Sequence, residues 1–128
     1  MGDPVRCPCR KKSETIAYAA CCEPLHAGLH PAATAEALMR SRYSAFALGN
    51  ETYLVATWHP STRPPRVDID PRQEWQHLRI VATRTDGDRA TVEFLARSRI
   101  GGTTRVLHEV SRFVRENGRW LYVDGDIR

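Results

Sequence analysis

The sequence lacks any long hydrophobic run, and its longest apolar stretches hold only a handful of residues. A membrane-spanning helix needs roughly 20 consecutive apolar residues, so no segment is a candidate span. The first seven residues contain no apolar stretch of the kind found in secretory signal peptides. We therefore expect a cytoplasmic protein.

Internal repeats, low-complexity segments and an extended basic cluster are also missing. The net charge of +4 arises from 19 basic and 15 acidic residues, and all but two of the basic residues are arginines scattered along the chain. Binding of nucleic acid is unlikely on this pattern, because such proteins concentrate basic and aromatic residues together. The one basic run, residues 10–12, is either a solvated loop or a docking patch for an anionic partner.

The chain is long enough for one compact domain but not for a second independent core. Its 41% apolar and 27% charged residues are ordinary values for a globular protein. All four cysteines and four of the eight prolines fall within residues 1–31. We therefore divide the chain into an irregular N-terminal segment, residues 1–31, and a folded body, residues 32–128.

The four cysteines form two closely spaced pairs, Cys7 with Cys9 and Cys21 with Cys22. Disulfides are disfavoured in the cytoplasm, so a metal site is favoured over a disulfide framework. Four thiolates suit a structural, tetrahedral Zn²⁺ ion. A redox-active or free set of thiols is the alternative, and His26 is a candidate to replace one cysteine ligand.

The body begins with two helical patterns and continues with four strand patterns. Thr34 and Asn50 are typical N-cap residues, and they predict helices that end near Leu48 and Trp58. Alternating apolar residues separated by glycine-containing turns predict strands over residues 74–83, 90–97, 104–115 and 119–124. This order predicts an α+β fold, with helices packed on a curved antiparallel sheet.

The faces of the strands follow from the two-residue turn Asn117-Gly118, which places Phe113 opposite Tyr122. One face then carries Glu109, Ser111, Phe113, Trp120, Tyr122 and Asp124. The other face carries Val110, Val114, Leu121 and Val123, a surface suited to a homodimer, although a monomer is equally open. In the first strand we expect Leu78, Ile80 and Ala82 on one side, and Trp75 and Val81 on the other.

Arg42 falls within the apolar face of the first helix, where an unpaired guanidinium is costly to bury. The first interpretation is a buried ion pair with Glu109 or Asp124. The second is that Arg42 binds a small anionic ligand.

His59 is the leading candidate for proton transfer, paired with Glu109 or Asp124 across a pocket. The alternative is that it caps the second helix through a carbonyl hydrogen bond. His108, on the other sheet face, is expected to be structural or exposed. The full set of candidate pocket residues is Arg42, Tyr43, Trp58, His59, Arg63, Glu109, Ser111, Tyr122 and Asp124.

Four stretches resemble known families. Cys7-Pro8-Cys9 followed by residues 18–28, YAACCEPLHAG, resembles the SEC-C motif, the zinc knuckle also found at the C-terminus of the SecA translocation ATPase. Residues 34–46, 57–64 and 118–125 resemble the bacterial YchJ-like proteins. The resemblance covers nearly the whole chain, but eleven residues separate the two cysteine pairs here, where the family usually has eight and a Gly-Ser-Gly turn.

The resemblance implies a nuclear-transport-factor-two-like (cystatin-like) cone for residues 32–128. It also implies that Cys7, Cys9, Cys21 and Cys22 are the zinc ligands. It supplies no reaction. The favoured hypothesis is a binding or adaptor protein that docks a protein partner through the zinc knuckle. The alternative is an acid–base enzyme of isomerase, dehydratase or hydrolase type, which uses the conical pocket.

Overall fold

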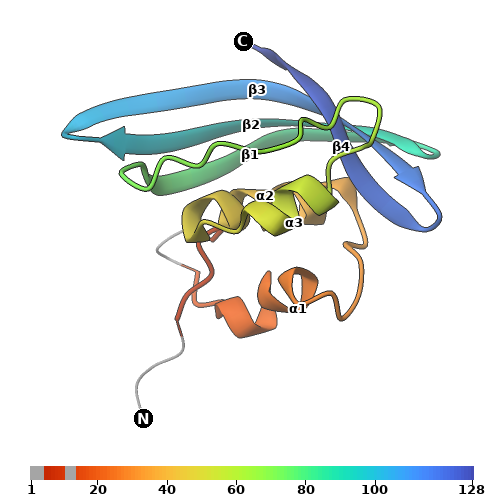
Figure 1. The fold of residues 1–128 in the computed structure, drawn as a ribbon, viewed down its shortest axis with the longest axis horizontal. Helices are drawn as coiled ribbons and strands as arrows, with labels where there is room; N and C mark the ends of the chain where they lie inside the picture. Colours follow the sequence, from red (N-terminus) through yellow and green to blue (C-terminus); the bar gives the residue numbers. More distant parts are fainter. Residues whose placement is uncertain (1–4, 11–13) are drawn as a thin grey trace.

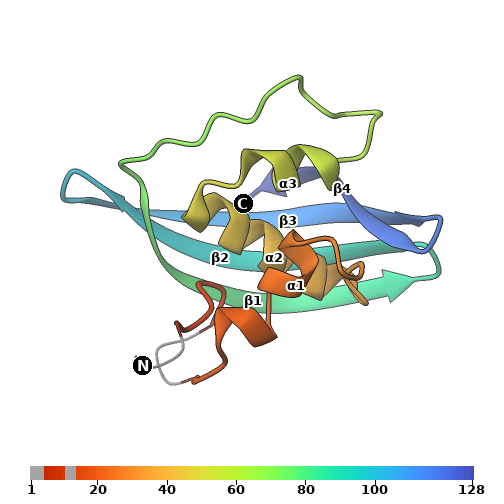
Figure 2. The same cartoon turned by 60° about the horizontal axis from the view of Figure 1, so that its bottom comes forward.

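The computed structural model describes residues 5–10 and 14–128, and Lys11 and Lys12 of the basic run lie outside this description. A four-stranded sheet covers helices α2 and α3, and the cysteine-containing segment lies beyond the helices, on the side away from the sheet (Figures 1 and 2). The elements in chain order are η1 (Tyr18–Ala20), α1 (Glu23–His26), α2 (Ala35–Leu48), α3 (Glu51–Ala56), β1 (Glu74–Asp86), β2 (Arg89–Ile100), β3 (Thr103–Glu116) and β4 (Arg119–Ile127).

The two predicted helix caps are confirmed. The Thr34 side chain accepts a hydrogen bond from the Ala37 N–H at the start of α2, and the Asn50 side chain accepts one from the Tyr53 N–H at the start of α3. Helix α2 ends at Gly49, whose φ of 74° favours glycine. Helix α3 ends two residues earlier than predicted, because residues 57–59 pair with the edge of β4 through hydrogen bonds to Tyr122.

The sheet has the order β1-β2-β3-β4, with every neighbouring pair antiparallel. Asn117 and Gly118 form the last turn with positive φ angles of 53° and 75°, as expected for this hairpin type. The predicted pairing of Phe113 with Tyr122 is confirmed. The α+β prediction is therefore confirmed.

Register shifts reverse three of the predicted side-chain positions. In β4 the ladder skips Val123, so Asp124 lies opposite Arg112 instead of sharing the face of Glu109. In β1 a shift beside Trp75 brings its ring onto the helix face, where it packs against the core. A second shift after Ile80 turns Ala82 to the exposed side. Each bulge inserts one residue and so exchanges the two faces beyond it.

The buried core continues from the sheet through α2 into the cysteine segment. Val92, Phe94 and Phe113 belong to the same cluster of buried side chains as Cys7, Cys9 and Cys22. Helix α2 is enclosed on both sides, and Ser41, Ser44 and Ala45 have no exposed surface. None of the described helices is long and apolar enough to cross a membrane.

The sheet face proposed for a homodimer is only partly available. Leu121 is buried, whereas Val110, Val114 and Val123 are half-buried in the single chain. The homodimer therefore stays a prediction.

Candidate metal centre and ligand cavity

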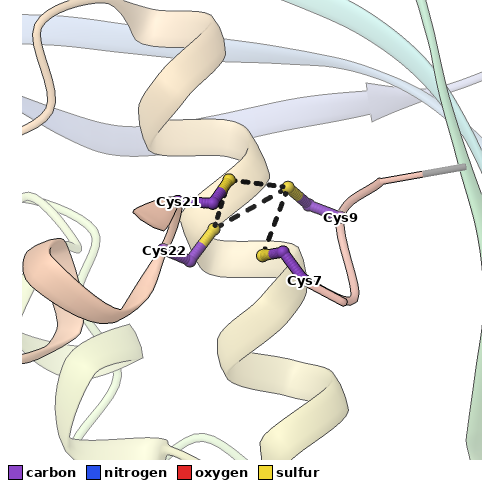
Figure 3. A group of neighbouring side chains, drawn as sticks. All are labelled: Cys7, Cys9, Cys21 and Cys22. Carbon is purple, nitrogen blue, oxygen red and sulfur yellow. Dashed lines mark hydrogen bonds between the residues drawn. The ribbon is translucent and has the colours of Figure 1, made fainter. Parts of the chain in front are cut away.

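The four cysteine sulfur atoms surround a common centre (Figure 3). The Sγ–Sγ distances are 3.6 Å from Cys7 to Cys9, 3.6 Å from Cys9 to Cys21, 3.8 Å from Cys22 to Cys9 and 3.9 Å from Cys21 to Cys22. A disulfide would require about 2.05 Å. A tetrahedral ion with metal–sulfur bonds of about 2.3 Å separates its ligands by about 3.8 Å. The donor set and its spacing therefore fit a tetrahedral metal ion.

Within the cluster, the surroundings favour the thiolate form of one cysteine, Cys7. Hydrogen bonds with Cys22 and Cys9 lower the pKa of the Cys7 thiol far below its ordinary value, and the Ser44 hydroxyl lies 3.4 Å from Cys7 Sγ. The same network, through Cys7 and then Cys9, raises the pKa of Cys22. The thiolate is the form that binds metal, and Cys7 is the thiol of the cluster that these contacts favour in that form.

Short local structures bring the two cysteine pairs together. The Cys7 N–H donates to the Ile16 carbonyl and the Tyr18 N–H donates to the Val5 carbonyl, so two short extended stretches run antiparallel. The second pair ends where α1 begins, and Pro24 stands in its first turn, a position that proline tolerates. Backbone pairing on one side and a helix start on the other therefore hold the two pairs in place.

Polar contacts fasten this segment to α2. Arg40 Nη1 donates to the Cys9 carbonyl at 2.8 Å. His26 Nε2 lies 2.8 Å from the Ser41 carbonyl, and its Nδ1 lies 2.7 Å from the Tyr18 hydroxyl. Because a carbonyl only accepts, Nε2 carries the proton and Nδ1 accepts from Tyr18. Both nitrogens of His26 are therefore engaged, and the alternative that His26 replaces a cysteine ligand does not fit this geometry.

A cavity of about 300 Å³ lies on the other side of α2, between the helices and the sheet. Six of the nine candidate pocket residues line it: Arg42, Tyr43, Trp58, Glu109, Ser111 and Tyr122. Trp75 and Phe46 complete an aromatic wall with Tyr43. The remaining three candidates, His59, Arg63 and Asp124, do not line it.

Arg42 makes no ion pair with Glu109 or Asp124, so that prediction is wrong. Its Nη1 donates instead to the Leu54 carbonyl at 2.8 Å and to Thr57 Oγ1 at 2.7 Å. The guanidinium carbon lies 5.2 Å and 4.6 Å from the ring centres of Trp58 and Tyr122. Burial lowers the pKa of Arg42 to about 10, so the side chain stays cationic at neutral pH. The end of α3 and two aromatic rings hold this charge in place of a carboxylate.

His59 lies outside the cavity and is paired elsewhere. Its Nε2 is 2.9 Å from Glu116 Oε2 and its Nδ1 is 2.7 Å from Ser61 Oγ. The predicted acid–base pair with Glu109 or Asp124 is therefore not formed, and the alternative of a side-chain cap is not observed either. Residues 57–59 pair with the edge of β4 as a short extended stretch, in which neighbouring side chains point to opposite sides. The Trp58 side chain therefore points toward the cavity and the His59 side chain points away from it.

The other displaced candidates also have partners on the surface. Arg63 is exposed and its Nε donates to the Trp58 carbonyl. Asp124 accepts from Arg112 on the opposite sheet face. His108, predicted to be structural or exposed, lies 2.7 Å from Glu93 Oε2. None of these contacts faces the cavity.

Glu109 is the acidic residue that lines the cavity, and two neighbours position it. The buried Ser111 hydroxyl donates a hydrogen bond to Glu109 Oε2. Gly125, opposite Ser111 in the ladder, leaves space for the carboxylate, since a Cβ there would lie 2.7 Å from Glu109 Cδ. Sequence reasoning missed Gly125 because the bulge at Val123 carries no clear signal in the residue pattern.

Fold and site together define a class: a nuclear-transport-factor-two-like α+β domain that follows an N-terminal cysteine knuckle. A family model described as the middle NTF2-like domain of YchJ matches residues 34–125. The chain belongs to this YchJ-like family.

Relatives match along almost the whole chain. A UPF0225 protein of Cupriavidus metallidurans is 49% identical over 98% of this chain and 91% of its own length. One from Bordetella parapertussis is 50% identical over 98% of this chain and 95% of its own.

Two solved structures share the fold. The solution structure of a SEC-C motif containing protein from Rhodopseudomonas palustris has a TM-score of 0.80 and 39% identity, covering 89% of this chain and 94% of that one. The crystal structure of a SEC-C motif containing protein from Psychrobacter arcticus has a TM-score of 0.78 and 32% identity, covering 95% and 82%.

Proposed function

We propose that this protein is a cytoplasmic binding module whose N-terminal segment, residues 1–31, is held by a structural Zn²⁺ ion on Cys7, Cys9, Cys21 and Cys22. The observation that carries the proposal is the spacing of the four sulfur atoms, 3.6 to 3.9 Å for the four pairs given above. Zinc is the divalent ion that four thiolates in a tetrahedron most commonly hold in structural sites. The SEC-C motif in the two similar structures supports the same assignment.

The zinc has a structural role because four protein ligands leave no position for water or substrate. Cys7, Cys9 and Cys22 are almost fully buried and Cys21 is half-buried, which also separates the site from solvent. The ion takes the place of the apolar core that this short segment lacks.

In this proposal the knuckle also provides the docking surface for a protein partner. Val5 is 77% exposed and Ile16 is 37% exposed, and they stand on the two short paired stretches that carry the first cysteines. Exposed apolar side chains on a rigid, metal-held scaffold are typical of a recognition surface. Arg6, between Val5 and Cys7, is also exposed.

The cavity is proposed to bind a ligand, and an acid–base enzyme is not proposed. The acid–base hypothesis depended on a histidine, and the residues that line the cavity include none. Arg42, Glu109 and Ser111 are suited to recognition, since they supply one cation, one carboxylate and one hydroxyl among aromatic walls.

The decisive experiment is metal analysis of protein purified without chelators. One zinc ion per chain is the expected result, and Cys22→Ser should reduce it to background. His30→Ala is a matched control from the same segment, because His30 is exposed and its one side-chain hydrogen bond among the described residues is with the adjacent Pro31 carbonyl. A wild-type protein without stoichiometric metal would refute the zinc assignment.

A further inference from the structure

Arg42 brings an incompletely paired positive charge into the interior. The side chain is only 5% exposed, and no carboxylate of the described residues lies within ion-pair distance of it. Both of its hydrogen bonds leave from Nη1. A buried cation without an anionic partner is unfavourable, so the site has an unmet preference for an anion.

The geometry of the guanidinium specifies the shape of that anion. Nε and Nη2 have no acceptor among the described residues, and neither is among the fully enclosed polar atoms that lack a partner. Both therefore keep some accessible surface, and Arg42 lines the cavity. Adjacent guanidinium nitrogens present two parallel N–H bonds, which match the two oxygens of a carboxylate.

The packing around Arg42 fixes the orientation of its guanidinium group. Nη1 ties the guanidinium to the last turn of α3, and Trp58 and Tyr122 lie on it at 5.2 Å and 4.6 Å. The Trp58 and Tyr122 rings are themselves perpendicular to one another, at 85°. A cation held by three elements loses little freedom on binding, which favours recognition.

Glu109 supplies a second polar point in the same cavity. Ser111 donates to Oε2 of its carboxylate, and Oε1 has no donor among the described residues. Glu109 and Arg42 both line the cavity and make no ion pair with each other, so a ligand could contact both. An ionised carboxylate accepts hydrogen bonds only, so its match on a ligand is a hydroxyl or amino donor.

The lining between these groups is mainly apolar and aromatic. Tyr43, Phe46 and Trp75 form one aromatic side, and Phe94 and Leu107 of the sheet form another. The volume of about 300 Å³ is at the lower end of the range for small-molecule sites. A single aromatic ring with two polar substituents suits this volume and this lining.

We propose that the cavity binds a small aromatic carboxylic acid that carries a hydroxyl or amino donor, with its carboxylate on Arg42 and its donor on Glu109. This inference rests on the proposed binding function and names its ligand class. The zinc site plays no part in the recognition, so metal analysis and ligand titration can fail independently.

The first test needs no mutation. The zinc-containing protein, labelled with ¹⁵N, is titrated with 4-hydroxybenzoate, 4-hydroxybenzamide and benzoate, and the Trp58 indole and Tyr122 amide resonances are followed. The charged acid should bind at least tenfold more tightly than the neutral amide, because a charge-assisted pair is lost in the amide. Benzoate, which lacks the donor, should bind several-fold more weakly than 4-hydroxybenzoate.

Variants then assign the two contacts. Arg42→Gln should weaken 4-hydroxybenzoate binding at least tenfold, and Glu109→Leu should abolish the preference for 4-hydroxybenzoate over benzoate. Glu109→Leu keeps the test valid if Arg42→Gln fails to fold, since Arg42 also anchors α3. Arg99→Gln, at an exposed arginine of β2, is the matched control and should bind as wild type. Equal binding of acid and amide, no binding of any probe, or unchanged affinity in a folded Arg42→Gln would overturn the proposal.

Discussion

The N-terminal segment, residues 5–31, and the body, residues 32–128, share one buried cluster but depend on different forces. The body buries large side chains such as Phe94, Phe113 and Leu54, and its stability comes from apolar packing. In the N-terminal segment the fully buried side chains, among the described residues, are cysteines. The comparison teaches that a short segment with few apolar side chains of its own can join a core through a cluster of buried cysteines.

The largest expected effect is the loss of structure in the N-terminal segment, but not in the body, when the proposed metal is removed. In Cys22→Ser, or after exhaustive chelation, the amides of Cys7 and Tyr18 should lose their protection from hydrogen exchange, because the pairing of residues 5–7 with 16–18 depends on the cluster. Structural zinc contributes roughly 10 kcal/mol or more in small zinc-binding peptides. Hydrogen exchange followed by mass spectrometry or NMR measures the loss.

In the same experiment the amides of Val92 and Phe94, in the central strand β2, should keep most of their protection. His30→Ala serves again as the control. If protection falls equally in β2 and in the N-terminal segment, the two regions form a single cooperative unit and the comparison fails.

The next largest effect concerns the apolar core of the body. Phe113→Ala removes a ring that is 1% exposed and packs 5.8 Å from the Tyr122 ring centre. Such truncations lower the free energy of unfolding by about 3–5 kcal/mol. Denaturant titration measures it, with Val106→Ala, at a site 62% exposed, as the control. A loss no greater than that of the control would contradict the assignment of Phe113 to the core.

A smaller effect concerns the contact between the two regions. His26→Ala leaves the Tyr18 hydroxyl and the Ser41 carbonyl without their partner, which destabilises the docked segment by about 1–3 kcal/mol. Zinc content should stay at one ion per chain, because His26 is not a ligand. A variant that loses zinc as completely as Cys22→Ser would show that His26 belongs to the metal site.

The smallest effect concerns the cavity side of the body. Gly125→Ala introduces a Cβ within 2.7 Å of Glu109 Cδ, and the flexible carboxylate must move away. We expect a destabilisation of about 1 kcal/mol, measured by thermal unfolding. Adding Glu109→Ala should remove this penalty. A penalty that persists in the double variant would place the conflict elsewhere.

Much of the framework was predictable because its causes are local. Thr34 and Asn50 cap helices through their own side chains, and Asn117-Gly118 sets the last hairpin through its positive φ angles. The cysteine cluster was also accessible, since the required donor chemistry is fixed by residue type. These features depend on residues close together in the sequence.

The cavity was less predictable because bulges decide which side chains enter it. Because the β4 ladder skips Val123, Asp124 lies on the sheet face away from the cavity and Gly125 lies on the cavity face. The shift after Trp75 places the Trp75 ring in the lining of the cavity. His59 and Arg42 found partners far away in sequence, Glu116 and the end of α3. Long-range geometry of this kind leaves no periodic signature.

Helix α2 packs against the cysteine segment on one side and lines the cavity on the other, and this limits which substitutions it can accept. Ser41, Ser44 and Ala45 have no exposed surface. The Ser44 hydroxyl lies close to Cys7 Sγ, and the backbone carbonyl of Ser41 contacts His26. Arg42, between the two serines in sequence, lines the cavity. A bulkier residue at any of the three small positions would act as a wedge between layers. The small side chains of this helix therefore set the distance between the cysteine cluster and the cavity.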